Sequence, residues 1–161
     1  MMTKASNVIA KLQGKTLVTA ESLTGGGIGA VLTGVPGASA VYKGGVISYT
    51  NEVKIKLLGV QPQLLDRVGA VSAPVAEAMA VGARDLLHAD IAVSVTGLAG
   101  PTGDEFGNAV GTVFVGYADH NGVSVGEYHF AGHREEVRNQ TIEAVLQLIL
   151  ANTSSGGIQV G

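Results

Sequence analysis

The sequence predicts an α/β protein, and more specifically a three-layer α/β/α domain built around a mixed, mainly parallel sheet. Short apolar runs rich in β-branched residues alternate with segments whose apolar residues recur at helical spacing. The 161 residues suit one domain, which would bury roughly two-thirds of its unfolded surface. Apolar residues make up 46% of the chain and charged residues 14%, a composition that excludes a disordered chain. We therefore expect a single domain over residues 1–161, with 155–161 as a frayed tail.

The first half of the chain alternates apolar segments with strong stop signals. The expected elements are a helix over 7–12, a strand over 17–20, a helix over 28–32, a strand over 44–50, a helix over 52–58 and a helical turn over 62–68. The run Thr33-Gly34-Val35-Pro36-Gly37 ends the second helix, because glycine and proline disfavour its continuation. Asn51 is the expected N-cap of the third helix and Gly59 its end.

The second half predicts a long helix, a strand, a hairpin and a closing helix. The expected ranges are 73–88, 90–96, 110–117 with 123–130, and 134–150. Ser72 is the expected N-cap of the long helix, and Pro74 lies in its first turn, where a missing N–H costs nothing. The expected inner faces of the two helices are Val75, Met79, Ala83, Leu86 and Leu87, then Val137, Thr141, Val145, Leu148 and Ile149.

Charge and residue usage exclude several classes of function. The net charge of −3 argues against a general nucleic-acid binder, which needs a basic face. No apolar run approaches the roughly 18 residues of a membrane span, and the polar start lacks a signal-peptide core. Without cysteine, and with four histidines at no ligand spacing, we expect no metal site. We expect a cytoplasmic protein without nucleic-acid or membrane partners, and the sparse charge favours a homo-oligomer.

The stretch from Leu17 to Gly27 is the first candidate site. Ser22 comes directly after an expected strand and before a glycine-rich turn into a helix. Ligands bind at the carboxyl ends of strands in open α/β sheets, and free N–H groups at a helix start favour an anion or an oxyanion. The same residues also fit a plain structural role, in which Ser22 or Thr24 caps the helix. The stretch alone leaves both interpretations open.

A second glycine-rich loop, Gly97-Leu98-Ala99-Gly100-Pro101-Thr102-Gly103, follows the strand over 90–96. Neither loop has the Walker A or Rossmann spacing, and Ser22 does not lie in a Gly-x-Ser-x-Gly elbow. Long loops in compact domains are often functional. A surface loop without function is equally compatible with this sequence.

Lys54 and Tyr49 could join Ser22. Most lysines are solvated, and that interpretation suits Lys54 and Lys56 by default. A tyrosine at a strand end and a lysine in the first turn of the next helix can, however, point into one crevice. The helix dipole lowers the pKa of such a lysine, and a neutral amine can deprotonate a serine.

Four blocks of the sequence resemble a known family. They are Thr19-Ala20-Glu21-Ser22-Leu23-Thr24-Gly25-Gly26, Gly44 to Lys54, Gly69-Ala70-Val71-Ser72, and Gly97 to Gly103. In order and spacing they resemble the CinA C-terminal domain family, whose characterised enzymes are nicotinamide mononucleotide amidohydrolases. The resemblance runs from about Val8 to Leu150.

The resemblance implies an α/β domain that hydrolyses the carboxamide of nicotinamide mononucleotide to nicotinate mononucleotide and ammonia, without a cofactor. The family's serine, tyrosine and lysine fall on Ser22, Tyr49 and Lys54, with the serine as nucleophile. The substrate-binding positions that it implies are Thr24, Gly25, Gly26, Gly97, Ala99, Gly100, Pro101 and Arg138. Leu23 replaces a cysteine found in many members, and Asn139 stands where some carry a second arginine. The alternative is a nucleotide-binding or regulatory module without turnover.

Overall fold

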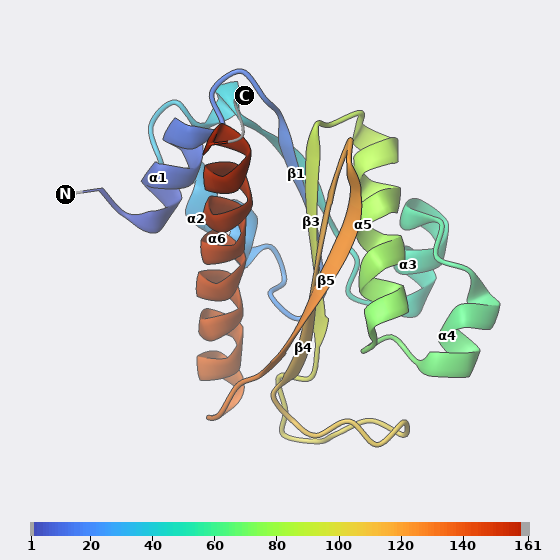
Figure 1. Ribbon diagram of the computed structural model, residues 1–161. Helices are drawn as coiled ribbons and strands as arrows, with labels where there is room; N and C mark the ends of the chain where they lie inside the picture. Colours follow the sequence, from blue (N-terminus) through green and yellow to red (C-terminus); the bar gives the residue numbers. More distant parts are fainter. Residues whose placement is uncertain (1, 159–161) are drawn as a thin grey trace.

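The computed structural model describes residues 2–158 and contains a five-stranded sheet between two layers of helices (Figure 1). The strands are β1 (Leu17–Glu21), β2 (Tyr42–Ile47), β3 (Ile91–Gly97), β4 (Thr112–Asp119) and β5 (Gly122–His129). They lie in the order β2-β1-β3-β4-β5. The strand that ends one residue before Ser22 is therefore an interior strand.

The sheet is mixed, and β4 alone runs opposite to the other four strands. β1 runs parallel to both β2 and β3, whereas β4 runs antiparallel to both β3 and β5. The α/β class and the mixed sheet are confirmed, and two of the four pairings are parallel because β4 runs antiparallel to both of its neighbours. The three parallel strands are β2, β1 and β3, so their carboxyl ends meet at one edge of the sheet.

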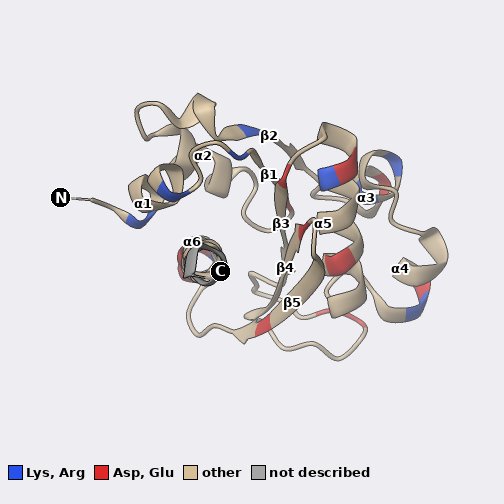
Figure 2. Ribbon diagram, turned by 45° about the horizontal axis from the view of Figure 1, so that its top comes forward, with Lys and Arg blue, Asp and Glu red and all other residues tan. Residues whose placement is uncertain are grey.

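Each face of the sheet is covered by its own helices (Figure 1). One layer contains α1 (Lys4–Lys11), α2 (Gly27–Thr33) and α6 (Arg134–Ile158), and the short 3₁₀ helix η1 (Ala38–Ala40) lies near α2. The other layer contains α3 (Asn51–Leu58), α4 (Pro62–Val68) and α5 (Ala73–Leu87). Charged residues are sparse and unevenly placed: α1 carries lysine alone, α2 carries none, and α4 carries both signs (Figure 2).

Alternation along β1 divides the core between the two layers. Leu17 packs with the residues of α1, α2 and α6, whereas Val18 and Ala20 pack with Val75 and Met79 of α5. Successive side chains of a strand point to opposite faces, so odd-numbered residues of β1 face α2 and even-numbered ones face α5. This alternation sets the directions of Glu21 and Ser22.

Several helix ends differ from the sequence-based expectation. Thr50 caps α3, because its Oγ1 accepts a hydrogen bond from the Val53 N–H, so the expected cap at Asn51 was wrong by one residue. Ser72 occupies the N-cap position of α5, but its hydroxyl donates to the carbonyl of Gly69 at 2.9 Å rather than capping the helix. Leu86 was wrongly placed on the inner face: its exposed fraction is 45%, and the stripe continues at Leu87 instead.

The closing helix is longer than its sequence pattern indicates. We expected it to end at Leu150, but α6 continues to Ile158. The expected frayed tail over 155–161 is therefore helical up to Ile158, and its last three positions, 159–161, lie outside the described residues. Between residues 2 and 158, no helix combines the length and apolar character needed to cross a membrane.

Candidate active site

Ser22 follows β1 and turns its side chain toward α3 and α5. Its backbone N–H donates to the carbonyl of Val95 on β3 at 3.2 Å, which continues the parallel pairing by one residue. Its own carbonyl accepts from the Gly25 N–H at 3.1 Å, which closes a tight turn. The exposed fraction of Ser22 is 7%. The serine hydroxyl is thus fixed at the carboxyl edge of the parallel strands, in a nearly water-free position.

Lys54 of α3 points directly at this serine. Its Nζ lies 3.1 Å from Ser22 Oγ, and it donates to the carbonyls of Ser48 at 2.8 Å and Tyr49 at 3.4 Å. The exposed fraction of Lys54 is 1%, and burial lowers the pKa of its ammonium to about 8. A buried lysine without a carboxylate partner becomes an accessible neutral amine near physiological pH. Lys54 and Ser22 thus form a buried amine–hydroxyl dyad, in which a neutral amine could take a proton from the hydroxyl.

The chain between β2 and α3 brings Lys54 to that place. The Ser48 N–H donates to the carbonyl of Glu21 at 2.7 Å and joins the segment after β2 to the end of β1. Thr50 then caps α3, and Lys54 follows in the first turn and a half of the helix. Ser48 and Ser22 lie next to each other where the ends of β2 and β1 are joined. The side chain of Lys54, four residues after the N-cap Thr50, therefore contacts both the Ser48 carbonyl and the Ser22 hydroxyl.

Tyr49 contacts the dyad through its backbone and not through its hydroxyl. Its carbonyl is one of the three acceptors around Lys54 Nζ. Its side chain is 57% exposed, and the hydroxyl accepts a hydrogen bond from Arg134 Nη2 at 3.0 Å. No hydrogen bond joins the Tyr49 hydroxyl to Lys54 in this structure, so the two side chains do not meet in the crevice that the sequence predicted. Arg134 also donates from Nη1 to the carbonyl of Gly100 at 2.7 Å, so it joins Tyr49 to the second glycine loop.

Arg138 braces the loop after Ser22. Its Nε donates to the carbonyl of Leu23 at 2.9 Å and its Nη2 to the carbonyl of Thr24 at 3.2 Å. Within residues 2–158 its Nη1 makes no hydrogen bond. The family resemblance implies a place for Arg138 at the substrate; in the structure its hydrogen bonds shape the first glycine loop.

The N–H groups at the start of α2 are already bound by a side chain of the protein. The N–H groups of Ile28 and Gly29 donate to the carboxylate of Glu21, each at 2.9 Å. The Thr24 hydroxyl also donates to Glu21, at 2.6 Å, so this side chain faces inward. The first loop nevertheless retains unused donors. Among the described residues, the N–H groups of Leu23, Thr24 and Gly26 have no hydrogen-bond partner.

The second glycine loop is held at both ends and carries unused donors in between. Gly97 ends β3, and the N–H of Leu98 and that of Gly111 donate across the neck of the loop. Asp104 and Asn108 bind each other, and Asn108 also donates to the carbonyl of Val71 at 3.0 Å. Between Gly97 and Gly103, all of which the structure describes, four residues have a backbone N–H without a partner: Ala99, Gly100, Thr102 and Gly103. Pro101, which lacks an N–H, is exposed and follows a cis peptide bond.

Sequence reasoning missed three residues of this site, namely Glu21, Ser48 and Arg134. Glu21 carried a usable signal, because a carboxylate at a strand end, before a glycine-rich turn into a helix, can bind the first N–H groups of that helix. Arg134 carried none, since a charged residue in the first turn of a helix is usually solvated.

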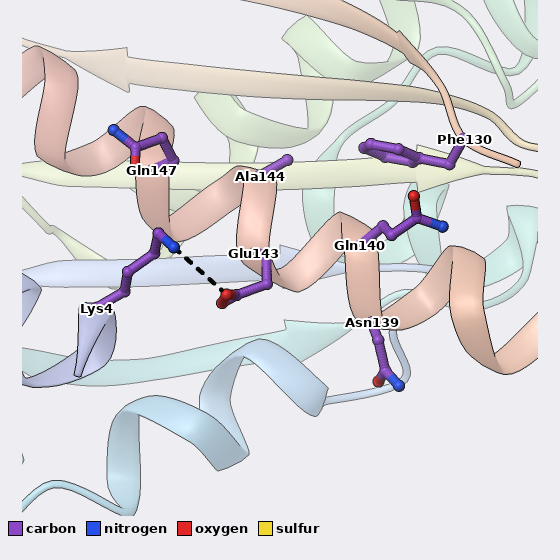
Figure 3. Close-up of a pocket in the computed structure, with 7 residues that line it drawn as sticks. All are labelled: Lys4, Phe130, Asn139, Gln140, Glu143, Ala144 and Gln147. Carbon is purple, nitrogen blue, oxygen red and sulfur yellow. Dashed lines mark ion pairs between the residues drawn. The ribbon is translucent and has the colours of Figure 1, made fainter.

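Two grooves elsewhere on the molecule do not include the dyad. A groove of about 480 Å³ follows α6 from Asn139 to Gln147 and is completed by Lys4 and Phe130 (Figure 3). Lys4 and Glu143 form an ion pair across it at 3.5 Å. A groove of about 280 Å³ lies between α5 and the β4–β5 turn. The described residues contain no group of three or more side chains suited to hold a metal ion.

Known proteins share both the sequence and the fold. Residues 2–153 match the CinA C-terminal domain. A CinA-like protein of Geobacter metallireducens is 50% identical over 132 residues, and one of Thermosynechococcus vestitus is 48% identical over 133 residues. These matches cover 82% and 80% of this chain but 32% of each relative. The chain thus spans about a third of the length of these curated relatives.

Solved structures match almost the whole chain. A competence/damage inducible protein from Agrobacterium tumefaciens is 38% identical with a TM-score of 0.88, and the match covers 92% of each chain. A competence-damaged protein (CinA) superfamily protein from Klebsiella pneumoniae is 30% identical with a TM-score of 0.89, and covers 95% of each chain. Sequence and fold agree, and the chain belongs to the CinA C-terminal domain family.

Proposed function

We propose that this chain is an amidohydrolase that converts nicotinamide mononucleotide and water to nicotinate mononucleotide and ammonia. The observation that carries the proposal is the buried contact between Lys54 Nζ and Ser22 Oγ at 3.1 Å. A serine needs a base to become a nucleophile, and a lysine with a pKa of about 8 supplies one near neutral pH.

The reaction proceeds through an acyl-enzyme. Ser22 Oγ bonds to the carboxamide carbon while its proton passes to neutral Lys54 Nζ. The resulting ammonium returns that proton to the amide nitrogen, the C–N bond breaks, and ammonia leaves. Water then attacks the ester carbon and gives a proton to Lys54, which returns it to Ser22 Oγ as the C–O bond breaks. Nicotinate mononucleotide is released, and Ser22 and Lys54 return to their starting protonation states.

The first glycine loop is suited to hold the oxyanion of the two tetrahedral intermediates. The unpartnered N–H groups of Leu23, Thr24 and Gly26 follow the nucleophile directly. Preorganised backbone donors next to a nucleophile stabilise the charge that develops in the transition state. Thr24 and Gly26 therefore contribute through their backbone N–H groups, since the Thr24 side chain is bound to Glu21 and the Gly25 N–H closes the turn onto the Ser22 carbonyl.

The second glycine loop and Arg138 are suited to hold the phosphate. The loop from Gly97 to Gly103 presents the free N–H groups of Ala99 and Gly100 near Arg134, and Arg138 retains Nη1. Backbone N–H groups and a guanidinium are the donors that phosphate prefers. Pro101 shapes this loop, and Tyr49 orients Lys54 through its carbonyl.

The test is release of ammonia from nicotinamide mononucleotide by the purified protein in the absence of added metal. We expect turnover that Ser22→Ala abolishes, with circular dichroism showing an unchanged fold. Binding of the nucleotide without ammonia release would overturn the proposal in favour of a binding or regulatory module.

A further inference from the structure

Glu21 is a buried carboxylate that the proposed chemistry does not use. Its exposed fraction is 2%, and no lysine or arginine within residues 2–158 forms a salt bridge with it. Burying an ionised carboxylate without a cation is costly unless hydrogen bonds replace its hydration. The burial of a carboxylate directly beside Ser22, the proposed nucleophile, therefore requires an explanation.

Both oxygens of Glu21 are saturated by donors from the loop and helix that follow Ser22. Oε1 accepts from Thr24 Oγ1 at 2.6 Å and from the Ile28 N–H at 2.9 Å. Oε2 accepts from the Gly29 N–H at 2.9 Å and from Thr19 Oγ1 at 3.3 Å. The donor at position 24 lies in the turn and those at 28 and 29 lie in α2, so the carboxylate joins the end of β1 to the turn and to the start of α2.

The surroundings keep these donors directed at the carboxylate. The Tyr42 hydroxyl lies 2.7 Å from Thr19 Oγ1, and burial, together with the charge of Glu21, raises the pKa of Tyr42. Tyr42 therefore stays protonated and can donate to Thr19, which leaves the Thr19 hydroxyl to donate to Glu21. A β-carbon at position 29 would lie 2.7 Å from the Tyr42 hydroxyl, so Gly29 is the residue that lets the helix approach this closely.

Glu21 and Ser22 are neighbours that work on opposite faces of the sheet. The Glu21 side chain points to the α2 layer and the Ser22 side chain to Lys54 of α3, as alternation along a strand requires. The main chain of Glu21 is also linked to Lys54 through Ser48. The Glu21 carbonyl accepts a hydrogen bond from the Ser48 N–H, and the Ser48 carbonyl accepts one from Lys54 Nζ. Residue 21 is thus fixed relative to both members of the dyad.

We propose that Glu21 is a positioning residue, whose carboxylate holds the turn from Ser22 to Gly26 so that the hydroxyl of Ser22 stays aligned with Lys54. The inference rests on the proposed function, since it needs Ser22 to be the nucleophile. It also implies that no substrate phosphate binds at the start of α2, because a group of the protein already occupies those donors.

The test compares Glu21→Gln with wild type by a rate that is measured per folded molecule. The amide keeps the size of the side chain, but its NH₂ group faces donors that need an acceptor, so the turn shifts. We expect the second-order rate of Ser22 modification by a fluorophosphonate probe to fall roughly 10²-fold, because a small misplacement of a reacting group costs about that much. The value of kcat for nicotinamide mononucleotide should fall in parallel. KM should stay within about threefold, because the phosphate is bound elsewhere.

Two further variants make the result decisive. Glu143→Gln, an exposed glutamate of α6, is the matched control and should react at the wild-type rate. Thr24→Val removes one donor at constant volume, and should slow the modification about tenfold, as expected for one lost charge-assisted hydrogen bond. If Glu21→Gln does not fold, Thr24→Val decides.

The outcomes separate this inference from the function on which it rests. A wild-type protein that is neither labelled at Ser22 nor active on the nucleotide overturns both. A labelled and active wild type, together with folded Glu21→Gln or Thr24→Val proteins that react at its rate, overturns the positioning role alone. If Glu21 only stabilised the start of α2, the two variants would melt at a lower temperature but would react at the wild-type rate per folded molecule.

Discussion

Lys54 Nζ lies 3.1 Å from Ser22 Oγ, although the two residues are 32 positions apart and come from different layers of the fold. The contact depends on β1 and β2 ending side by side, since Ser48 joins their ends and its carbonyl receives the lysine. The lysine is surrounded by neutral oxygen acceptors, so burial acts on its pKa without a compensating negative charge.

The first prediction concerns the pH dependence of activity. The pKa of Lys54 is lowered to about 8, so the neutral amine becomes the major form only above that pH. Ammonia release should therefore rise through an apparent pKa of about 8 in the pH dependence of kcat/KM. A profile that is flat from pH 6 to 10 would remove Lys54 as the base.

The same group should make stability depend on pH. Below pH 8 Lys54 is charged in both the folded and the unfolded protein. Between pH 8 and the ordinary lysine pKa of 10.5, Lys54 is largely neutral in the folded protein but still protonated in the unfolded chain. Stability therefore rises with pH in this window, by about 3 kcal/mol in order of magnitude. Urea unfolding of wild type and Lys54→Met at pH 7.5 and 10.5 measures this effect. Between the two pH values, the free energy of unfolding of the wild type should rise relative to that of the variant. A constant difference between them would contradict the depressed pKa.

Substitutions at Lys54 should distinguish a base from an electrostatic anchor. Arginine keeps the positive charge but cannot give up its proton, so Lys54→Arg should lose kcat by roughly 10²-fold or more, nearly as much as Lys54→Met. Lys56→Ala, on the exposed side of α3, is the control and should retain activity. If Lys54→Arg keeps most of the rate, the proton must travel by another route.

Tyr49→Phe should leave most of the turnover intact. The hydroxyl is bound to Arg134 and only the carbonyl touches Lys54, so loss of the hydroxyl leaves the dyad in place. We expect kcat to change by less than about tenfold, as for one neutral hydrogen bond at the surface. A loss as large as that of Lys54→Met would put the tyrosine hydroxyl in the proton path.

Arg138→Ala should affect both substrate binding and turnover. Removal of Nη1 should raise KM for the nucleotide, and removal of the braces on Leu23 and Thr24 should lower kcat by roughly tenfold. Comparison with nicotinamide riboside separates the two effects, because the riboside has no phosphate to lose and should show the kcat loss alone. Equal loss of kcat/KM on both compounds would mean that Arg138 does not bind phosphate.

The order of elements and the serine–lysine pair could be predicted because local signals carry them. Periodicity and turn residues place β1, α5 and α6, and short blocks of sequence carry Ser22 and Lys54. The partners of those residues could not be predicted in the same way. Arg134 meets Tyr49 across 85 positions, and which donors a carboxylate such as Glu21 finds depends on the path of the chain beyond the turn. The one-residue difference at Thr50 has a simpler cause, since threonine and asparagine both cap helices.

Arg134 and Arg138 lie one helical turn apart at the start of α6, and each binds a different glycine loop. Four residues of α-helix advance by about 6 Å, so the spacing of the two loops follows the pitch of a rigid helix. Both loops are thereby anchored to the first turns of one helix. Under the proposed function, a shift of α6 would move both loops together relative to Ser22, and we expect substitutions inside α6, far from Ser22 Oγ, to change KM for the nucleotide.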